Sequence, residues 1–320
     1  MPPLLKIILR RVGLGILTLF LVSVLVFAAT QALPGDTARA ILGRSATPER
    51  LKEVRERLGL DRPATTQYVE WLGNIVRGDL GDSLVAAAPV TSLLGDRVRN
   101  SAILVFLAAI ISIPLSILIG SLSGLLRDRW FDSGVSLGSL ALAALPEFVI
   151  GILLIMLFAT QVFQIVPAVS RVDPNLPLYE QLDVLILPAL TLVLAVAPYI
   201  IRILRASMVE VLESEYVQMA RLKGMPERIV LQRHALPNAV IPAIQVIALN
   251  LAWLAGGVVV VEYLFNYPGI GSELIDAVSN RDVPMIQAIV LLIASLYVGF
   301  NLIADILTIL VSPRLRTGLQ

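Results

Sequence analysis

Residues 216–237 read YVQMARLKGMPERIVLQRHALP and form a charged stretch in an otherwise apolar chain. Apolar segments at residues 184–201 and 239–261 lie on either side of it. Gly224 breaks the stretch, and Pro226 can begin a second helix because proline is favoured at the first helical position. We therefore predict a helix–Gly–helix elbow within residues 207–237 that projects from a membrane and contacts a partner in water.

The composition is typical of an integral membrane protein. The chain has 320 residues, of which 57% are hydrophobic and 15% charged, and its mean hydropathy is +0.84. Soluble domains have about half apolar and about a quarter charged residues. The net charge of +1 gives no reason to expect a polyanionic partner such as nucleic acid. With no cysteine, and with His234 as the single histidine, we expect no disulfide, metal site or cofactor.

Six segments are apolar enough to be membrane spans, for which about 20 residues are needed. They are residues 12–33, 102–126, 134–163, 184–201, 239–261 and 285–311. The fourth is short and holds two prolines, so we expect it to be kinked. The first is longer than the apolar core of a signal peptide, which favours an uncleaved anchor. We predict an all-α integral membrane protein with six transmembrane helices.

The distribution of Lys and Arg predicts the orientation of these helices. If the N-terminus is cytoplasmic, thirteen such residues lie on the cytoplasmic side and two in the short outer loops. Residues 34–100 are long enough to be exempt from this rule. We therefore expect both termini and the elbow in the cytoplasm and residues 34–100 outside. Two helices are expected in that outer segment, one starting at Thr47-Pro48-Glu49 and one carrying Tyr68 and Trp71, both docked on the outer ends of the spans.

Glu147 is the carboxylate expected deepest in the membrane. It lies 13 residues after Gly134, or roughly 20 Å along a continuous helix. A lipid-facing charge at that depth costs at least about 2.5–3.5 kcal/mol. Glu147 is therefore expected either to line a transport pathway or to be a structural carboxylate beside a kink at Pro146.

Five other polar residues lie in or near the spans. Gln245, Asn250 and Asn301 could line a pathway or form interhelical hydrogen bonds, which is the commoner use. Asp305 is expected to pair with an arginine near the cytoplasmic face. Glu262 is expected to reach the outer headgroups.

Catalytic motifs are absent from the sequence. There is no Gly-x-x-x-x-Gly-Lys-Ser/Thr loop that would bind ATP, and no His-Glu-x-x-His motif. The only histidine lies in the elbow, so none is placed to activate a nucleophile. We predict that the chain is not an enzyme, and that energy for transport comes from a partner or from an ion gradient.

The elbow resembles the cytoplasmic coupling loop of ABC-transporter permeases that work with a substrate-binding protein. That loop reads Glu-Ala-Ala, three residues, Gly, nine residues, Ile, one residue, Leu-Pro; the positions here are Gln218-Met219-Ala220, Gly224, His234 and Leu236-Pro237. The last Ala, the Gly and the Leu-Pro match, and the other three positions depart from the general pattern. The resemblance implies ATPase contacts by Tyr216, Gln218, Ala220, Arg221, Lys223, Gly224, Arg233, His234, Leu236 and Pro237.

Further motifs resemble the dipeptide/oligopeptide/nickel branch of these permeases and cover nearly the whole chain. They are residues 33–36 (LPGD), 58–61 (LGLD), 71–84 (WLGNIVRGDLGDSL), 221–224 (RLKG), 233–238 (RHALPN), 262–271 (EYLFNYPGIG), 281–284 (RDVP), 301–305 (NLIAD) and 312–314 (SPR). The forms at 221–224 and 233–238 are those of this branch. Each motif is weak alone, and their occurrence in order is the strong signal.

The resemblance implies a type I ABC importer permease in a bacterial cytoplasmic membrane. Residues 1–100 would form the first span and an extracytoplasmic region, residues 101–312 a five-helix core with the coupling loop at 205–237, and residues 313–320 a cytoplasmic tail. The implied partners are a second, non-identical permease, two cytoplasmic ATPases and an extracytoplasmic substrate-binding protein. The implied cargo is short peptides, with nickel chelates or other small solutes as alternatives, moved by alternating access. A secondary transporter with Glu147 as its proton site is the remaining alternative.

Overall fold

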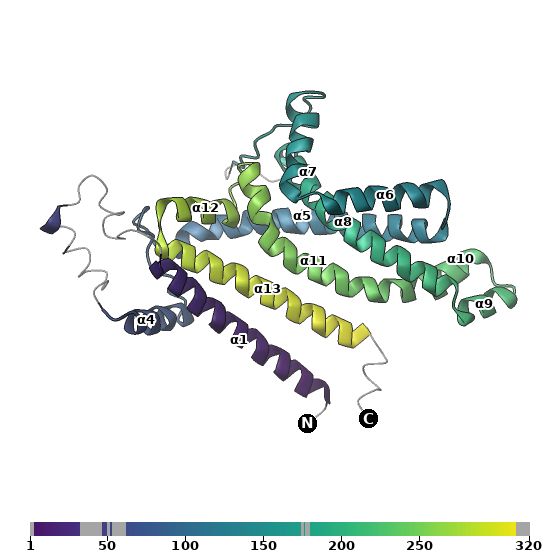
Figure 1. The fold of residues 1–320 in the computed structure, drawn as a ribbon, viewed down its shortest axis with the longest axis horizontal. Coiled ribbons are helices and arrows are strands. Elements are labelled where there is room, and N and C mark those ends of the chain that lie inside the picture. Colours follow the sequence, from purple (N-terminus) through teal and green to yellow (C-terminus); the bar gives the residue numbers. More distant parts are fainter. Residues whose placement is uncertain are drawn as a thin grey trace.

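The computed structural model describes residues 3–32, 47–49, 52, 62–173, 176 and 180–311, and this part of the chain is almost entirely helical (Figure 1). The helices are α1 (Pro3–Ala32), α4 (Ala64–Val76), α5 (Val90–Leu125), α6 (Trp130–Ala144), α7 (Glu147–Ile155), η2 (Met156–Thr160), α8 (Leu182–Leu212), α9 (Glu215–Leu222), α10 (Glu227–Ile229), η4 (Val230–Ala235), α11 (Leu236–Leu264), α12 (Ile270–Asn280) and α13 (Val283–Val311).

Five helices of the described chain are each long and apolar enough to cross a membrane. They are Ile8–Ala32, Val90–Leu125, Leu182–Leu212, Glu227–Leu254 and Val283–Ile306. A sixth span exists if α6 and the segment from Glu147 to Thr160 count as one bent pair. The predicted all-α membrane fold is confirmed. The fourth span is longer than predicted, because α8 is one helix of 31 residues with both prolines inside it.

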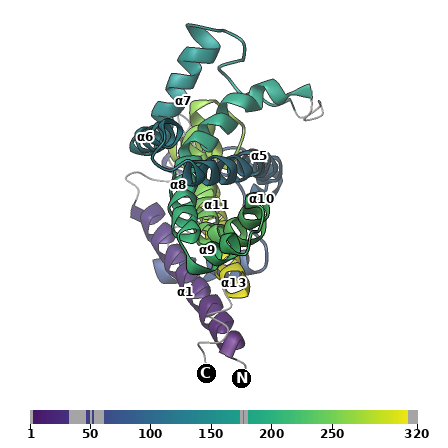
Figure 2. The same ribbon diagram turned by 90° about the vertical axis from the view of Figure 1, so that its right-hand side faces the viewer.

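The segment predicted as the third span, residues 134–163, contains a bent pair of helices, and the kink considered at Pro146 is found. Helices α6 and α7 meet at an angle of 105°, and α7 projects away from the other helices in both views (Figures 1 and 2). The cause is Pro146, because the residue before a proline is pushed out of the helical region. Leu145 accordingly has the extended angles φ −92° and ψ 133°. Glu147 therefore lies at the start of α7, directly after a sharp bend.

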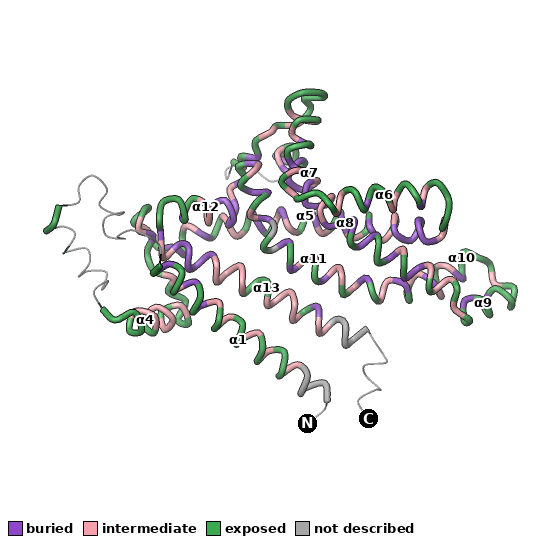
Figure 3. Tube along the Cα trace, viewed as in Figure 1, coloured by how far each residue is buried: buried purple, intermediate pink, exposed green. Residues whose placement is uncertain are grey.

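Helix α8 is the central helix of the bundle (Figure 3). Most of its side chains between Leu185 and Met208 are buried, whereas α1, α5 and α13 each expose many apolar side chains. Two glycines of α5 allow α8 to approach closely. A Cβ on Gly120 would lie 2.9 Å from the carbonyl oxygen of Ile201, and one on Gly124 would lie 2.7 Å from Cβ of Met208. Small residues at this spacing let helix backbones pack closely in membranes.

The bundle has two ends, which we call the elbow end, at α9, and the α12 end. They lie at opposite ends of the long axis (Figure 1), and the start of α1 and the last residues of α13 point the same way along that axis as the elbow. Arg11 of α1 and Asp305 of α13 form an ion pair with an Nη1–Oδ2 distance of 3.0 Å. Asp305 was expected to pair with an arginine near the cytoplasmic face, and Arg11 is one of the cations that the Lys and Arg distribution assigns to that face.

Helix α4 docks on the last turns of α1, as predicted for the outer segment. The rings of Tyr68 and Trp71 lie 5.3 and 5.6 Å from the ring of Phe27. The hydroxyls of Tyr68 and Ser23 are hydrogen bonded at 2.8 Å. The other predicted outer helix, which would start at Thr47, lies mostly outside the described residues, as does the tail at 313–320.

Candidate functional site

The elbow consists of two helical arms joined by a turn at Gly224. The first arm, α9, follows α8 after Glu213 and Ser214. The second arm begins after Pro226 and runs through α10 and η4 into α11 without a non-helical residue. Gly224 has φ +75°, a left-handed conformation that glycine adopts at little cost. A Cβ at this position would contact nothing within 4 Å, so the backbone conformation, and not space, requires glycine here.

The elbow has a small hydrophobic core of its own. Val217 and Ala220 of α9 and Val230 of η4 are buried against one another, with Leu212 and Met225 at the edge. Of the residues predicted to contact an ATPase, Ala220 therefore faces the second arm. Its small size lets the two arms meet, and its contribution to any docking surface is through the shape of the elbow.

The outer face of α9 is exposed and partly apolar. Tyr216, Met219 and Leu222 follow one another at a spacing of three residues, and Leu222 is 82% exposed. Gln218, Arg221 and Lys223 are exposed beside them. Met219 and Leu222 were not among the predicted contact residues, although their three-residue spacing from Tyr216 was visible in the sequence. Clustered apolar side chains on a polar surface are typical of a protein interface.

An ion pair crosses the turn between the two arms. Arg221 Nη2 donates to Glu227 Oε1 at 2.6 Å, and Arg221 Nε donates to Glu227 Oε2 at 3.1 Å. The hydrogen bonds to Glu227 raise the pKa of the Arg221 guanidinium above its ordinary value. The fork geometry fixes the angle between the arms, although both side chains are partly exposed and the energetic gain is accordingly modest.

The remaining predicted contact residues lie in the second arm. Pro237 has no N–H to donate, and in a regular α-helix its ring would clash with the carbonyl four residues earlier. It lies at the start of α11, and the wider π-helical turn η4 comes immediately before that helix. Arg233 and Pro237 are exposed, whereas His234 and Leu236 are half-buried. The backbone oxygen of His234 accepts a hydrogen bond from Nδ2 of Asn238 at 2.7 Å.

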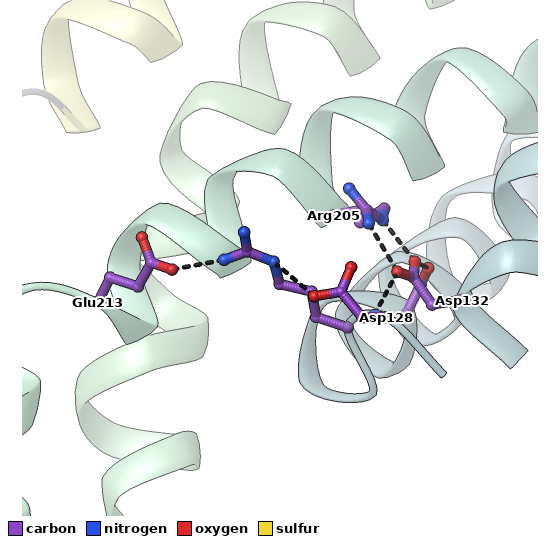
Figure 4. Close-up of polar contacts among 6 residues, drawn as sticks. Asp128, Asp132, Arg205 and Glu213 are labelled. Carbon is purple, nitrogen blue, oxygen red and sulfur yellow. Dashed lines mark hydrogen bonds and ion pairs between the residues drawn. The ribbon is translucent and has the colours of Figure 1, made fainter. Parts of the chain in front are cut away.

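A polar cluster ties the base of the elbow to the start of α6 (Figure 4). Arg205 of α8 donates from Nε and Nη2 to the two oxygens of Asp132 at 2.5 and 2.6 Å. Ser123 donates to Asp132 at 2.5 Å, and Asp132 is buried. Arg127 donates to Glu213, which directly follows α8, at 2.5 Å. The Arg205–Asp132 and Arg127–Glu213 pairs could not be predicted from the sequence pattern, since each joins residues more than seventy positions apart.

The four predicted pathway residues do not meet in one site. Glu147 is half-buried and makes no hydrogen bond or ion pair with the described residues. Gln245 is exposed. The amides of Asn250 and Asn301 donate to the carbonyl oxygens of Val246 and Tyr297, four residues earlier in the same helix. The expected interhelical hydrogen bonds of these two asparagines are therefore not found.

An apolar groove of about 720 Å³ opens between α5, α11 and α13, lined among others by Phe106, Leu251 and Phe300. None of the four pathway candidates is among its lining residues. The expectation that Glu262 reaches the outer headgroups is also wrong. Glu262 is fully buried at the α12 end of the bundle, because hydrogen-bond donors of α5 and α12 surround its carboxylate.

These features define a multi-pass helical membrane protein with an exposed, partly apolar surface on α9 at one end. Residues 113–317 match the family of inner membrane components of binding-protein-dependent transport systems, and residues 4–112 match the N-terminal region of such membrane components.

Named relatives align over nearly the full length. A putative peptide transport system permease of Brucella abortus is 37% identical over 312 residues, which cover 97% of this chain and 98% of the relative. A probable peptide ABC transporter permease of Sinorhizobium fredii and the glutathione transport system permease GsiC of Escherichia coli are each 37% identical, with the same two coverages. The chain belongs to the family of binding-protein-dependent inner-membrane transport components, and it is the permease of an ABC importer.

Replacing Gly224 with alanine is expected to loosen the elbow. The left-handed conformation costs a residue with a Cβ about 1–2 kcal/mol, so the amides of α9 should exchange with deuterium roughly five- to thirtyfold faster. Asparagine, which tolerates this conformation better, should have a smaller effect. Gly73→Ala is the matched control, because Gly73 lies inside helix α4 with nothing within 4 Å of its Cβ position. Equal exchange in the wild type and Gly224→Ala would contradict this role for Gly224.

Proposed function

We propose that this permease imports short peptides across a bacterial cytoplasmic membrane, driven by ATP that partner subunits hydrolyse. The observation that carries the proposal is the outer face of α9, with apolar and cationic side chains on an arm that is held rigid from within. In this proposal a cytoplasmic ATPase receives that face in a groove. Closure of the ATPase pair then moves the elbow. Helices α8 and α11 tilt with it because the first arm follows α8 and the second arm continues into α11.

The cargo is inferred from the relatives. Two are named for peptide transport and one for glutathione, which is itself a short peptide. Identity of 37% over nearly the whole length supports the same class of cargo. Nickel chelates and other small solutes remain the alternative cargo.

The proposed assembly contains this permease, a second and different permease, two ATPases and an extracytoplasmic binding protein. The cation distribution supports an arrangement with both termini and the elbow in the cytoplasm. The α12 end would then face outward, where α4 and the segment before it could receive the binding protein or only cover the helix ends. ATP hydrolysis belongs to the partners, since the chain has no P-loop.

The test is uptake of a labelled dipeptide or tripeptide library into proteoliposomes that hold the complete transporter, with the binding protein outside. We expect uptake to require ATP inside the vesicles and to be unaffected when a proton ionophore is added. Uptake that follows an imposed proton gradient without ATP would contradict the proposal and favour the secondary transporter. Uptake of a nickel chelate and not of peptides would show that the proposed cargo is wrong and would leave ATP-driven import standing.

Replacing Glu147 with glutamine is expected to change the rate or cargo preference of uptake while assembly with the ATPases stays normal. The carboxylate follows the bend of the α6–α7 pair and has no partner among the described residues, which suits a group that contacts cargo or the second permease. The matched control is Glu180→Gln, which removes an exposed carboxylate just before α8 and outside the coupling loop. Unchanged uptake of several peptides of different charge by Glu147→Gln would remove Glu147 from the pathway.

A further inference from the structure

Glu262 is a buried carboxylate that lies outside the elbow and has no part in the proposed contact with the ATPase. It lies near the last turn of α11 and its side chain accepts hydrogen bonds from two other elements. Ser101 Oγ of α5 donates to Oε1 at 2.5 Å, and the backbone N–H of Gly271 in α12 donates to Oε2 at 2.7 Å. Glu262 therefore holds the first turn of α12 and one turn of α5 to the same point of α11.

The turn from α11 to α12 is closed tightly around this carboxylate. A Cβ on Gly269 would lie 2.2 Å from Cδ of Glu262, and a Cβ on Gly271 would lie 2.3 Å from Cα of Val259. Both glycines are thus required by space, in contrast to Gly224. The backbone of α12 consequently starts in direct contact with α11, with no room for another side chain between them.

Residues of α5 form hydrogen bonds with the same turn from the other side. Nδ2 of Asn100 donates to the carbonyl oxygen of Pro268 at 2.9 Å, and the hydroxyl of Tyr267 donates to the carbonyl oxygen of Asn100 at 2.8 Å. Ser101 Oγ accepts from the N–H of Ile270 at 2.9 Å while it donates to Glu262. We call Asn100, Ser101, Glu262 and residues 267–271 the Glu262 junction.

The Glu262 junction lies at one end of a long continuous helix, and the second arm of the elbow lies at the other end. From Glu227 to Leu264 the backbone is helical throughout, a length of roughly 55 Å at about 1.5 Å per residue. Figure 1 shows α10 and α12 at opposite ends of the molecule, with α11 between them. A displacement of the second arm of the elbow is therefore carried by one continuous helix to the residue that holds α12.

Helix α12 has further polar contacts beyond the junction. Glu273 pairs with Arg97 of α5 at an Nη2–Oε2 distance of 3.0 Å. Asp282, just after α12, accepts hydrogen bonds from the Ser83 hydroxyl and from the N–H of Leu84. These contacts attach α12 to the outer ends of neighbouring elements, so a shift of α12 would rearrange the α12 end of the bundle.

We propose that Glu262 is a positioning residue that fastens α12 to α11, so that movement of the elbow changes the arrangement of the opposite, extracytoplasmic face. The proposal rests on the proposed function of the elbow as the ATPase contact. A carboxylate suits this position because it presents two acceptors to two donors. Leucine has a similar size but no acceptor, so the Ser101 hydroxyl and the Gly271 N–H would both lose their hydrogen bonds to residue 262.

The test measures motion at both ends of this continuous helix, residues 227–264, in the reconstituted transporter. The chain has no cysteine, so pairs of spin labels can be placed at will. One pair, at Ser279 of α12 and Thr66 of α4, reports on the α12 end, and another, at Arg228 of α10 and Trp130 of α6, reports on the elbow; all four side chains are exposed. Distances are compared without nucleotide and with ATP plus vanadate.

We expect the wild type to show a nucleotide-dependent distance shift for both label pairs. In Glu262→Leu the α12 shift should be lost while the elbow shift and ATP hydrolysis remain. Glu273→Leu is the matched control: it removes a carboxylate of α12 outside the junction, and the α12 shift should remain. Ser101→Ala removes one donor and leaves the carboxylate, so it should reduce the α12 shift in part and serves as the test if Glu262→Leu does not assemble.

An α12 shift of wild-type size in Glu262→Leu would overturn the proposal. Equal loss in Glu262→Leu and Glu273→Leu would also overturn it, because any weakening of α12 would then have the same effect. If the wild-type elbow itself does not move with nucleotide, the proposed function fails and this inference falls with it.

Discussion

Replacing Leu222 with glutamate is expected to abolish ATP-driven uptake by preventing the ATPase from binding. Leu222 is 82% exposed on α9, so the substitution leaves the core of the elbow intact. If the side chain is buried in the ATPase groove, its apolar contact is worth about 2 kcal/mol and a buried unpaired carboxylate costs more. ATPase affinity should then fall at least roughly thirtyfold, measured by co-purification and by titration in detergent.

The control for this substitution is Val76→Glu. Val76 of α4 is 81% exposed and lies far from the elbow (Figure 1), so the same change at equal exposure should leave ATPase binding unaltered. Normal ATPase binding by Leu222→Glu would show that this face of α9 is not the contact. A loss in both variants would point to a general effect of added charge.

Replacing Arg205 with alanine is expected to destabilise the protein more than any other single change at the base of the elbow. The substitution leaves the buried carboxylate of Asp132 without its bidentate partner. Breaking one side of a buried ion pair costs about 3 kcal/mol or more. The free energy of unfolding should fall by about this amount in a titration with sodium dodecyl sulfate in mixed micelles.

The chain offers a matched comparison in the neighbouring ion pair. Arg127→Ala removes the partner of Glu213, but both of those side chains are about half-exposed, so the cost should stay within about 1 kcal/mol. The double variant Asp132→Ala/Arg205→Ala should be less destabilised than the sum of its single variants, because the two residues are coupled. Equal stability of Arg205→Ala and Arg127→Ala would mean that burial of Asp132 contributes nothing.

The elements of the fold that depend on local pattern were predictable. Apolar runs of about 20 residues identified the spans, and Gly224 with Pro226 predicted the two arms of the elbow. The Tyr68 and Trp71 stripe predicted α4 and its contact with a span. In each case neighbouring residues decide the outcome, through backbone conformation or through one continuous apolar face.

The features that depend on distant residues were not predictable in the same way. Burial of Glu262 requires a donor at Ser101, 161 positions away, and no single segment contains both. Asp132 and Arg205 find each other only after α5 and α8 have packed. The bend at Leu145 is different in kind: Pro146 is a local signal, and a kink there was one of the two expectations, but the apolar run on both sides of it did not predict a bend of 105°.

A site-specific cross-link tests most directly whether α9 contacts a cytoplasmic ATPase. The chain has no cysteine, so a single cysteine at Lys223 can carry a benzophenone maleimide. In membranes that contain the assembled transporter, illumination should yield an adduct of this permease with an ATPase subunit, whereas the same label at Val76 should yield none. Absence of an ATPase adduct from Lys223 in an intact complex, or an equal yield from Val76, would contradict the account.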